Sequence, residues 1–444
     1  MKIPDIEKFS WGHAIIRPFL DFYHDWIFNQ RVYKLGKENL PKEGPLLVTF
    51  SHQCALMDSM VMLSVSNWQP VHIARADIFK PKFQRKLLFF FKMMPVFRTR
   101  DGLKNVKETL ETFDKASDVF RKKKFVIIAP EANHRPKRRI RTLSKGFARM
   151  AFKAEEDNDF KLGLRILPVG IHYEDYYSAR ISVVVNIGKP IEFKDLHELY
   201  KQDEQKALIA LRDRVAEEMK KLIIHIEDLD IYDECELIRE VGTDVLAKKK
   251  KKRIWNEKDR FIIGKEVVDI LRDKVKKQKP ELFSQMVDKA REYKTLLDKE
   301  NLCDFIVAKD SSLFKLIIKT VWFIATLPVF LYGALFNLPV YYTPKIMTRN
   351  IKDESFHTSV RFVFYLVLYP LYYLILFLVS GYFIDNIWMR LLFTVSLPLA
   401  GMFSISYARG LKKLYKKFKF HFSPFKEKLK KLRQDLYSML EQVL

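Results

Sequence analysis

The longest hydrophobic stretches lie toward the carboxyl end of the chain, at residues 313–342, 360–384 and 387–408. Each is long enough to cross a bilayer, which takes about 20 apolar residues in a helix. Tyrosine and tryptophan gather near the ends of these stretches, where aromatic side chains anchor spans at the membrane–water interface. The pattern predicts a membrane region over residues 311–408.

The three hydrophobic stretches differ in their spacing along the chain and in the residues that could bend a helix. Only Asp385 and Asn386 separate the second from the third, which indicates a hairpin of two spanning helices. The first contains Pro328, Gly333 and Pro339, where a helix can bend. We expect residues 313–342 to be a re-entrant or interfacial segment, with spans at 360–384 and 387–408; three full spans are the alternative.

Between residues 35 and 225, short β-type runs alternate with helical stretches. The expected strands are Leu46–Phe50, Val71–Arg75, Phe125–Ala129, Ile166–Ile171 and Ile181–Ile187. The expected helices lie near 58–67, 80–92, 103–123, 144–156 and 204–226. Such alternation predicts an α/β fold, here one layered domain with a central mixed sheet.

The segment before this domain, residues 1–34, is rich in aromatic residues. At helical spacing, one face of residues 11–30 carries Trp11, Ile15, Phe19, Phe22, Trp26 and Ile27. We expect an amphipathic helix in the membrane interface or packed on the following domain, and both can hold at once.

Two other regions are strongly charged. Residues 226–310 are polar with a helical pattern and include the run Lys248–Lys252, which fits either a solvated helical region or a basic patch on anionic headgroups. The tail, residues 409–444, carries eleven Lys or Arg against three acidic residues. Because positive loops stay on the cytoplasmic side, we expect the tail, the loop 345–361 and the α/β domain to face the cytoplasm.

Composition narrows the class of protein. The 444 residues are 48% hydrophobic and 30% charged, which excludes a mainly disordered chain. The net charge of +25 is typical of proteins that bind nucleic acid or anionic membranes. The apolar stretches and the absence of a nucleic-acid-binding motif favour the membrane. The three cysteines, Cys54, Cys235 and Cys303, are scattered, which argues against a disulfide framework or a paired-cysteine zinc site.

The first chemical motif follows the strand Leu46–Phe50. His52 comes directly after the strand end, and Asp58 follows six positions later. In α/β domains, this edge of the sheet is where active sites lie. A carboxylate in the first turn of the next helix can hold an imidazole in one tautomer and stabilise its protonated form. The spacing therefore makes His52 and Asp58 candidates for general-base catalysis.

Two cationic clusters lie further along. Arg98 and Arg100 alternate in an extended segment, so that both guanidinium groups can bind one phosphate. The strand Phe125–Ala129 leads into Glu131 and a basic loop. Candidate substrate-binding residues from this loop and the following helix are Glu131, Asn133, His134, Arg135, Lys145 and Arg149. A surface loop facing the membrane is the alternative for these cations.

The order of these motifs, His–Asp, Arg, Pro–Glu and then the apolar segment with Pro168, resembles the glycerolipid acyltransferases, over residues 33–193. Two departures from the common family pattern are similar to the fungal-type glycerol-3-phosphate/dihydroxyacetone-phosphate acyltransferases. Five residues, not four, separate His52 from Asp58, and the box after the strand reads Ala129–Pro130–Glu131–Ala132–Asn133–His134. Ala132 stands where those relatives have glycine.

The resemblance implies a mechanism and a set of partners. His52 would act as general base on an acceptor hydroxyl, with Asp58 orienting it, and the oxygen would attack an acyl thioester directly. The remaining candidates would bind the phosphate and glycerol part of the acceptor. The co-substrate would be acyl-CoA or acyl carrier protein, with no metal and no other cofactor.

The function expected is a membrane-bound glycerol-3-phosphate acyltransferase that makes lysophosphatidate. It would be integral to the cytoplasmic membrane, or to the endoplasmic reticulum in a eukaryote. One alternative is a lysophosphatidate acyltransferase that makes phosphatidate. An alternative of another class is a non-catalytic protein that binds anionic membranes through its basic patches. A nucleic-acid partner is not expected.

Overall fold

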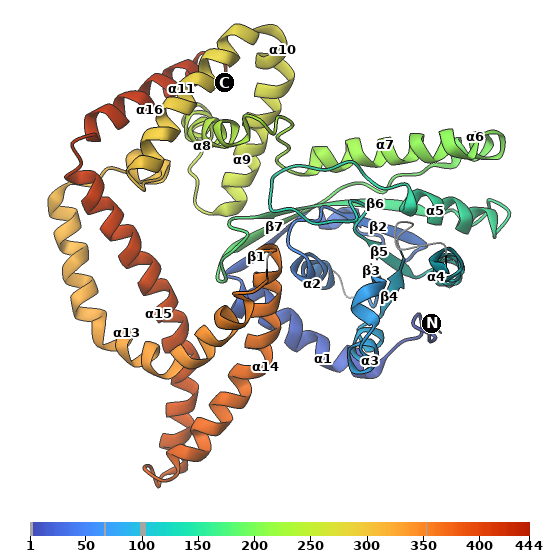
Figure 1. The fold of residues 1–444 in the computed structure, drawn as a ribbon, viewed down its shortest axis with the longest axis horizontal. Helices are drawn as coiled ribbons and strands as arrows, with labels where there is room; N and C mark the ends of the chain where they lie inside the picture. The colour runs from blue at the N-terminus through green and yellow to red at the C-terminus, as the bar shows by residue number, and fades with distance from the viewer. Residues whose placement is uncertain (1–2, 66–67, 98–103, 352) are drawn as a thin grey trace. The chain divides into compact units, whose positions relative to one another are not determined.

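The computed structural model describes residues 3–65, 68–97, 104–351 and 353–444. The chain divides into two compact units (Figure 1). The first comprises Met1–His225 together with the short segment Asp353–Ser359, and the second comprises Ile226–Lys352 and Val360–Leu444. Each unit has a hydrophobic core of its own.

The first unit is built on a mixed seven-stranded sheet with the order β1-β7-β6-β2-β5-β3-β4. Its strands are β1 (Arg31–Leu35), β2 (Leu46–Phe50), β3 (Val71–Arg75), β4 (Met93–Val96), β5 (Phe125–Ile128), β6 (Arg165–Tyr173) and β7 (Ser182–Ile187). The β6–β7 pair is antiparallel and the other pairs are parallel. The α/β fold with a central mixed sheet is thereby confirmed.

Seven α-helices accompany the sheet in the described part of the first unit. They are α1 (Trp11–Phe22), α2 (Leu56–Val65), α3 (Lys82–Phe90), α4 (Lys104–Arg121), α5 (Gly146–Glu156), α6 (His197–Gln202) and α7 (Glu204–Leu222). Helices α4, α5 and α7 share one core with alternate strand residues such as Leu47, Val126 and Ile166. Helix α2 lies on the other side of the sheet from α7 (Figure 1). Covered on both faces, the central strands read as continuous apolar runs.

Two strands lie outside the predicted set, and both are edge strands. β4 contains Pro95, which cannot donate to a ladder and is tolerated at a sheet edge. β1 lies at the opposite edge and pairs with β7. Its residues Arg31–Leu35 begin inside the segment 1–34 that was expected to be helical. None of the residues of β1 is fully buried, so the strand carries little hydrophobic signal.

The amino-terminal segment is helical. Unlike an ordinary surface helix, it exposes large apolar side chains and buries polar ones. α1 continues as a π-helix over Tyr23–Phe28. The side chains of His13 and Arg17 are buried, whereas the apolar residues Trp11, Ile15, Phe19, Phe22 and Trp26 are between 50% and 76% exposed. The helix thus packs on the domain through His13 and Arg17 together with the apolar Leu20, and it presents an apolar face outward, as interfacial helices do. Immersion of that face in lipid stays a prediction.

The buried polar groups under α1 make stability depend on pH. His13 and His72 are each 2% exposed. Burial, together with the charge of Arg17, lowers the pKa of His13 to about 4 and that of His72 to about 3. In the unfolded chain both titrate near the ordinary value of about 6.5. Between pH 6.5 and 4 the unfolded state therefore binds more protons, and stability falls as the pH falls.

We expect the melting temperature of the detergent-solubilised protein to drop on acidification from about pH 7 to about pH 5. Each histidine contributes about 1.4 kcal/mol per pH unit below its unfolded pKa. In the His72→Leu variant this slope should be shallower, because one of the two buried groups no longer titrates. Thermal denaturation across the pH range measures the slopes, and equal slopes in the two proteins would contradict the assignment.

The second unit is entirely helical in its described residues. Its helices are α8 (Tyr232–Lys249), α9 (Glu257–Ile270), a π-helical turn (Leu271–Val275), α10 (Lys276–Gln278), α11 (Pro280–Lys299), α12 (Asp304–Ala308), α13 (Leu313–Thr348), α14 (Ser355–Ser380), α15 (Ile387–His421) and α16 (Lys426–Glu441). α14 begins within the segment assigned to the first unit. Helices α8, α9, α11, α12 and α16 enclose one hydrophobic core.

The basic tail is part of that core. α16 buries Leu429, Leu432, Leu436 and Leu440, which recur every three or four residues, against the helices of the charged region 226–310. The two segments thus form one packed helical bundle. The run Lys248–Lys252 is exposed on this bundle, whereas Arg239 is buried.

The first apolar stretch lies within one helix, α13 (Leu313–Thr348), and its re-entrant or interfacial course stays a prediction. Pro328, Pro339 and Pro344 lie inside it. Three helices, Leu313–Thr348, Phe356–Ser380 and Ile387–His421, are long and apolar enough to cross a membrane. The carboxyl-terminal region is therefore suited to membrane embedding, and both the re-entrant arrangement and the three full spans stay predictions.

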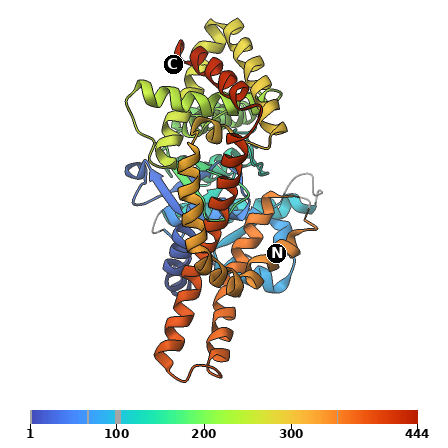
Figure 2. The ribbon, with the colours of Figure 1, turned by 90° about the vertical axis from the view of Figure 1, so that its left-hand side faces the viewer.

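Helix α13 packs closely against α15. Figures 1 and 2 both show the two helices side by side. A methyl group at Gly333 would overlap the carbonyl oxygen of Ala400, so the backbones approach closely there. The amide nitrogen of Asn337 donates to the carbonyl oxygens of Gly333 (2.8 Å) and Leu397 (3.1 Å), and its oxygen accepts from Tyr373 Oη of α14 (2.6 Å).

Candidate active site

The candidate site begins at the carboxyl end of β2, a central strand whose five residues are all buried. His52 follows the strand, and the chain turns through Ala55, which has a φ of 46°, into α2. Asp58 lies in the first turn of α2, and its Oδ2 atom lies 2.8 Å from His52 Nδ1. The structure thus contains the contact between His52 and Asp58 that the spacing predicts. The chain between these two residues turns at Ala55.

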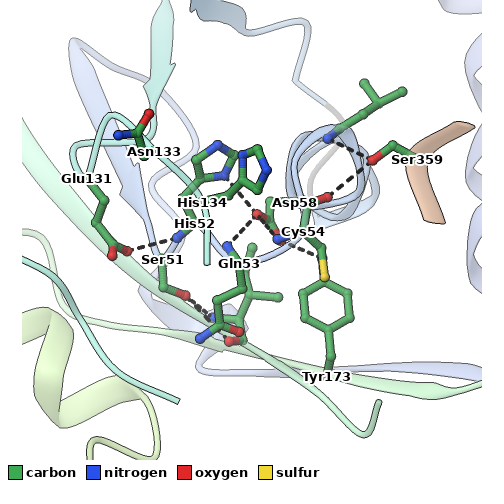
Figure 3. A network of polar contacts seen from close by, with 12 residues as sticks. Ser51, His52, Gln53, Cys54, Asp58, Glu131, Asn133, His134, Tyr173 and Ser359 are labelled. Carbon is green, nitrogen blue, oxygen red and sulfur yellow. Dashed lines mark hydrogen bonds and ion pairs between the residues drawn. The ribbon is translucent and has the colours of Figure 1, made fainter. Parts of the chain in front are cut away.

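Asp58 is completely buried and is held by several donors (Figure 3). Its Oδ2 atom also accepts the backbone N–H groups of Gln53 and Cys54, each at 2.8 Å. Its Oδ1 atom accepts the hydroxyl of Tyr173 at 2.7 Å. Backbone donors and a phenol thus converge on one carboxyl group and hold it in place behind the imidazole.

The second ring nitrogen of His52, Nε2, lies on the side of the imidazole away from Asp58. With Nδ1 donating to the carboxylate, Nε2 is the unprotonated nitrogen and can accept a proton. The side chain is 17% exposed, and among the described residues no hydrogen bond to Nε2 is found. The pair is therefore a carboxylate-backed base with its reactive nitrogen open to a substrate.

Glu131 fixes the backbone of His52. It follows β5, and its Oε1 atom accepts the His52 N–H at 2.9 Å while its Oε2 atom accepts the Arg141 N–H at 3.0 Å. Burial raises the pKa of Glu131 to about 7, against the lowering effect of these two donors. Since both oxygens bind backbone groups, the structure gives Glu131 a positioning role; direct contact with substrate stays a prediction.

The loop after Glu131 wraps around His52. The Arg135 N–H donates to the His52 carbonyl oxygen at 3.3 Å, and the Asn133 N–H donates to Glu131 O at 2.7 Å. The His134 ring lies edge-on to His52 at 5.3 Å between centroids, and its Nε2 atom lies 3.0 Å from Asp353 Oδ2. Three of the predicted residues, Asn133, His134 and Arg135, are thus brought to the candidate base.

Ala132 keeps the backbone conformation that glycine adopts freely. Its φ is 59°, in the left-handed region, so the loop has this conformation despite its side chain. We expect Ala132→Gly to retain activity, whereas Ala132→Val should lower stability by about 1–2 kcal/mol, because a β-branched residue is strained there. Melting temperatures and turnover of both variants test this; an Ala132→Val protein as stable as the wild type would contradict it.

The other predicted substrate-binding residues are placed elsewhere. Lys145 Nζ contacts Gln205 Oε1 at 3.1 Å, and Arg149 Nε lies 3.7 Å from Glu204 Oε1, so both engage the start of α7. Among the described residues, neither side chain forms a hydrogen bond or ion pair with His52 or Asp58. Arg98 and Arg100 lie outside the described residues. Binding of substrate by these four residues stays a prediction.

Tyr173 was not among the predicted site residues. It ends β6, which runs parallel to β2, so both strands finish at the same edge of the sheet. That rule could have singled out the last residue of β6, but the strand was expected to stop at Ile171. The Cys54 and Gln53 backbone donors could not have been found from side-chain patterns.

Neither hydroxyl nor thiol beside the base is arranged as a nucleophile. Ser51 is fully buried, and its Oγ atom accepts the Ile171 N–H at 2.8 Å. Burial raises the pKa of the Cys54 thiol well above its usual range, which makes it unreactive. In the described ranges, no group of three or more His, Cys, Asp or Glu residues could hold a metal ion. The base is thus placed to activate a hydroxyl supplied by a substrate.

Comparison with known proteins agrees with this chemistry. Residues 31–172 match the family model described as Acyltransferase. A similar solved structure is the 1-acyl-sn-glycerophosphate (LPA) acyltransferase PlsC from Thermotoga maritima, at 20% identity over 47% of this chain and 76% of that chain, with a TM-score of 0.34. Comparison with curated proteins gives no match.

Residues 31–172, the part of the chain that is similar to the acyltransferases, contain His52, Asp58 and Glu131. This match agrees with the acyltransferase resemblance inferred from motif order. A particular closeness to the fungal-type enzymes stays a prediction.

Proposed function

We propose that the protein is a membrane-bound acyltransferase that transfers a fatty acyl group from an acyl thioester to glycerol-3-phosphate, making lysophosphatidate for phospholipid biosynthesis. The observation that carries the proposal is the 2.8 Å contact of His52 Nδ1 with the buried carboxylate of Asp58. This contact leaves Nε2 as the acceptor at an open site. The acyltransferase domain and the three apolar helices in one chain support a lipid product.

The reaction follows from the geometry of the base. His52 Nε2 takes the proton of the acceptor hydroxyl as its oxygen attacks the thioester carbonyl carbon, and Asp58 stabilises the imidazolium that forms. When the tetrahedral intermediate collapses, the new C–O ester bond remains and the C–S bond breaks. The thiolate leaves with the proton that His52 returns. No covalent acyl-enzyme forms, consistent with the buried Ser51 and Cys54.

Because the phosphate of the acceptor is an anion, its binding requires cationic side chains near His52. The exposed Arg135 is attached to the loop that wraps His52. We assign phosphate binding to Arg135 together with Arg98 and Arg100, and contact with the glycerol part to Asn133 and His134. Arginine suits this role because its planar fork binds phosphate oxygens in pairs. The basic surface also suits an acidic donor, acyl-CoA or acyl carrier protein.

Acceptor choice is the decisive experiment. The purified protein in detergent would receive a radiolabelled acyl thioester with either glycerol-3-phosphate or lysophosphatidate, and the lipid products would be separated. Labelled lysophosphatidate from glycerol-3-phosphate alone is the expected result. Lysophosphatidate is the second candidate acceptor, since it carries the same phosphomonoester; labelled phosphatidate alone would assign the second acylation. No product with either acceptor would favour a non-catalytic membrane-binding protein.

The proposal includes a location. We place the acyltransferase domain on the cytoplasmic face of the membrane, because soluble acyl donors are made there and because the basic residues flanking the spans favour that side. The membrane would be the cytoplasmic membrane, or the endoplasmic reticulum in a eukaryote. Protease protection of sealed vesicles, read with an antibody to the first unit, tests this orientation.

A further inference from the structure

The segment Asp353–Ser359 follows α13 in the chain, yet it belongs to the unit that holds the candidate site. Figure 3 shows Ser359 beside Asp58 and Cys54. We propose that this segment, named here the 353–359 strap, is a positioning element of the active site that holds the His52–Asp58 pair in its productive geometry. The inference rests on the proposed acyl transfer.

The hydroxyl groups of the strap bind the connection that carries Asp58. Ser359 Oγ accepts the N–H of Leu56 at 3.2 Å and donates to the Cys54 carbonyl oxygen at 3.4 Å. Leu56 begins α2, where N–H groups have no partner within the helix. Thr358 Oγ1 donates to the carbonyl oxygen of Tyr176 at 3.0 Å. Ser359 therefore supplies the capping contact that fixes the start of α2.

This contact reaches Asp58 through the backbone. The N–H of Cys54 donates to Asp58 Oδ2 at 2.8 Å, while the carbonyl oxygen of the same residue accepts from Ser359. Thr358 and Ser359 are each only 5% exposed, so water cannot readily replace these bonds. Loss of either hydroxyl would leave buried polar groups unpaired and loosen the turn that aims the carboxylate.

The first residues of the 353–359 strap contact His134, whose ring lies beside that of His52. Asp353 Oδ2 lies 3.0 Å from His134 Nε2, and the Phe356 ring meets the His134 ring edge-on at 4.7 Å. These contacts orient the His134 ring, which in turn lies 5.3 Å from that of His52. The strap thus contacts the site at the turn before Asp58 and at the wall beside His52.

The strap continues directly into an apolar helix. α14 runs from Ser355 to Ser380, and Phe356–Ser380 is long and apolar enough to span a membrane. The residues that complete the site therefore lie on the first turns of a candidate membrane span. The geometry of the base consequently depends on a helix whose sequence position lies some 300 residues from His52.

The placement of the strap can be tested without any assay of activity. Cys54 Sγ lies 3.8 Å from the carbonyl oxygen of Tyr176, the same atom that Thr358 Oγ1 contacts at 3.0 Å. In a Thr358→Cys variant, mild oxidation should link the introduced thiol to Cys54, as mass spectrometry of the digested protein would show. Glu354→Cys, exposed on the same segment, is the control and should form no such link.

The positioning role is tested by matched kinetic variants of the full chain. Thr358→Val and Asp353→Asn should each lower kcat on the order of tenfold while leaving the KM for the acyl thioester unchanged. Thr358→Ser keeps the hydroxyl and should restore kcat. Glu354→Gln removes a neighbouring exposed charge and should match the wild type.

The outcomes separate this inference from the proposed function. A Thr358→Cys crosslink together with the kcat losses supports the strap as a positioning element. An active wild type in which Thr358→Val and Asp353→Asn keep full kcat, or in which no crosslink forms, overturns it. A wild type that turns over neither acceptor but forms the crosslink overturns the proposed function, and with it any catalytic role of the strap.

Discussion

Replacing His52 with alanine should reduce acyl transfer by roughly 10²- to 10⁴-fold, the contribution of a positioned general base. The variant removes Nε2, the nitrogen that the Asp58-backed imidazole offers to an acceptor hydroxyl. The His52 backbone bonds to Glu131 and Arg135 do not involve the side chain, so the loop should keep its place. Turnover with the preferred acceptor, at saturating acyl thioester, measures the effect.

A matched control makes this result specific. His197→Gln changes a histidine of the same unit that packs among Phe152, Phe160 and Phe193, away from the end of β2. It should retain turnover, and both variants should be recovered from the membrane fraction in wild-type amounts. Wild-type activity in His52→Ala would show that another group takes the proton and would overturn the mechanism.

The second large effect is expected from Asp58→Asn. The amide nearly matches the carboxylate in shape but carries no charge, so the imidazolium formed during transfer loses its counter-ion. We expect kcat to fall by roughly 10²- to 10⁴-fold, comparable with the loss of the base itself. The KM for the acyl thioester should change little, because no contact between Asp58 and that substrate is expected.

Tyr173→Phe is the matched comparison for Asp58→Asn. It removes the single donor to Asp58 Oδ1 and leaves the bonds of Oδ2 to His52, Gln53 and Cys54 intact. Its effect should be about tenfold or less. If Asp58→Asn kept the turnover of the wild type, charge behind the imidazole would be irrelevant and the carboxylate would have a structural role alone.

The central strands were predictable because burial on both faces leaves an unmistakable apolar run. β2 and β3 have the bounds expected from the sequence. The edge strands β1 and β4 were not predictable in the same way, since an edge strand needs neither a continuous apolar run nor a donor at every position, as Pro95 illustrates. The prolines inside α13 do not end the helix, because proline in a membrane helix is tolerated when neighbouring helices supply the packing.

The core of the candidate site was predictable for a local reason. His52 and Asp58 are joined by a short connection, so sequence spacing constrains their geometry directly. Tyr173 and the 353–359 strap reach the same place from distant parts of the chain. No spacing pattern reports the contacts of the strap, and the strand-end rule would have reached Tyr173 only with the correct end of β6. The uses of Lys145 and Arg149 were ambiguous, since a cation near a helix start can equally well pair with Glu204 or bind a ligand.

The amide of Asn337 bears on how the chain is assembled during synthesis. It belongs to α13, whereas its partners Tyr373 and Leu397 lie on α14 and α15, which are made later. Lipid tails offer no replacement for these bonds, so a nascent chain carrying α13 alone would expose an unpaired oxygen to hydrocarbon. A product that stopped before α15 would still lack the Leu397 carbonyl oxygen that accepts from the amide nitrogen of Asn337. We therefore expect α13 to leave the insertion machinery only after the two following helices have emerged.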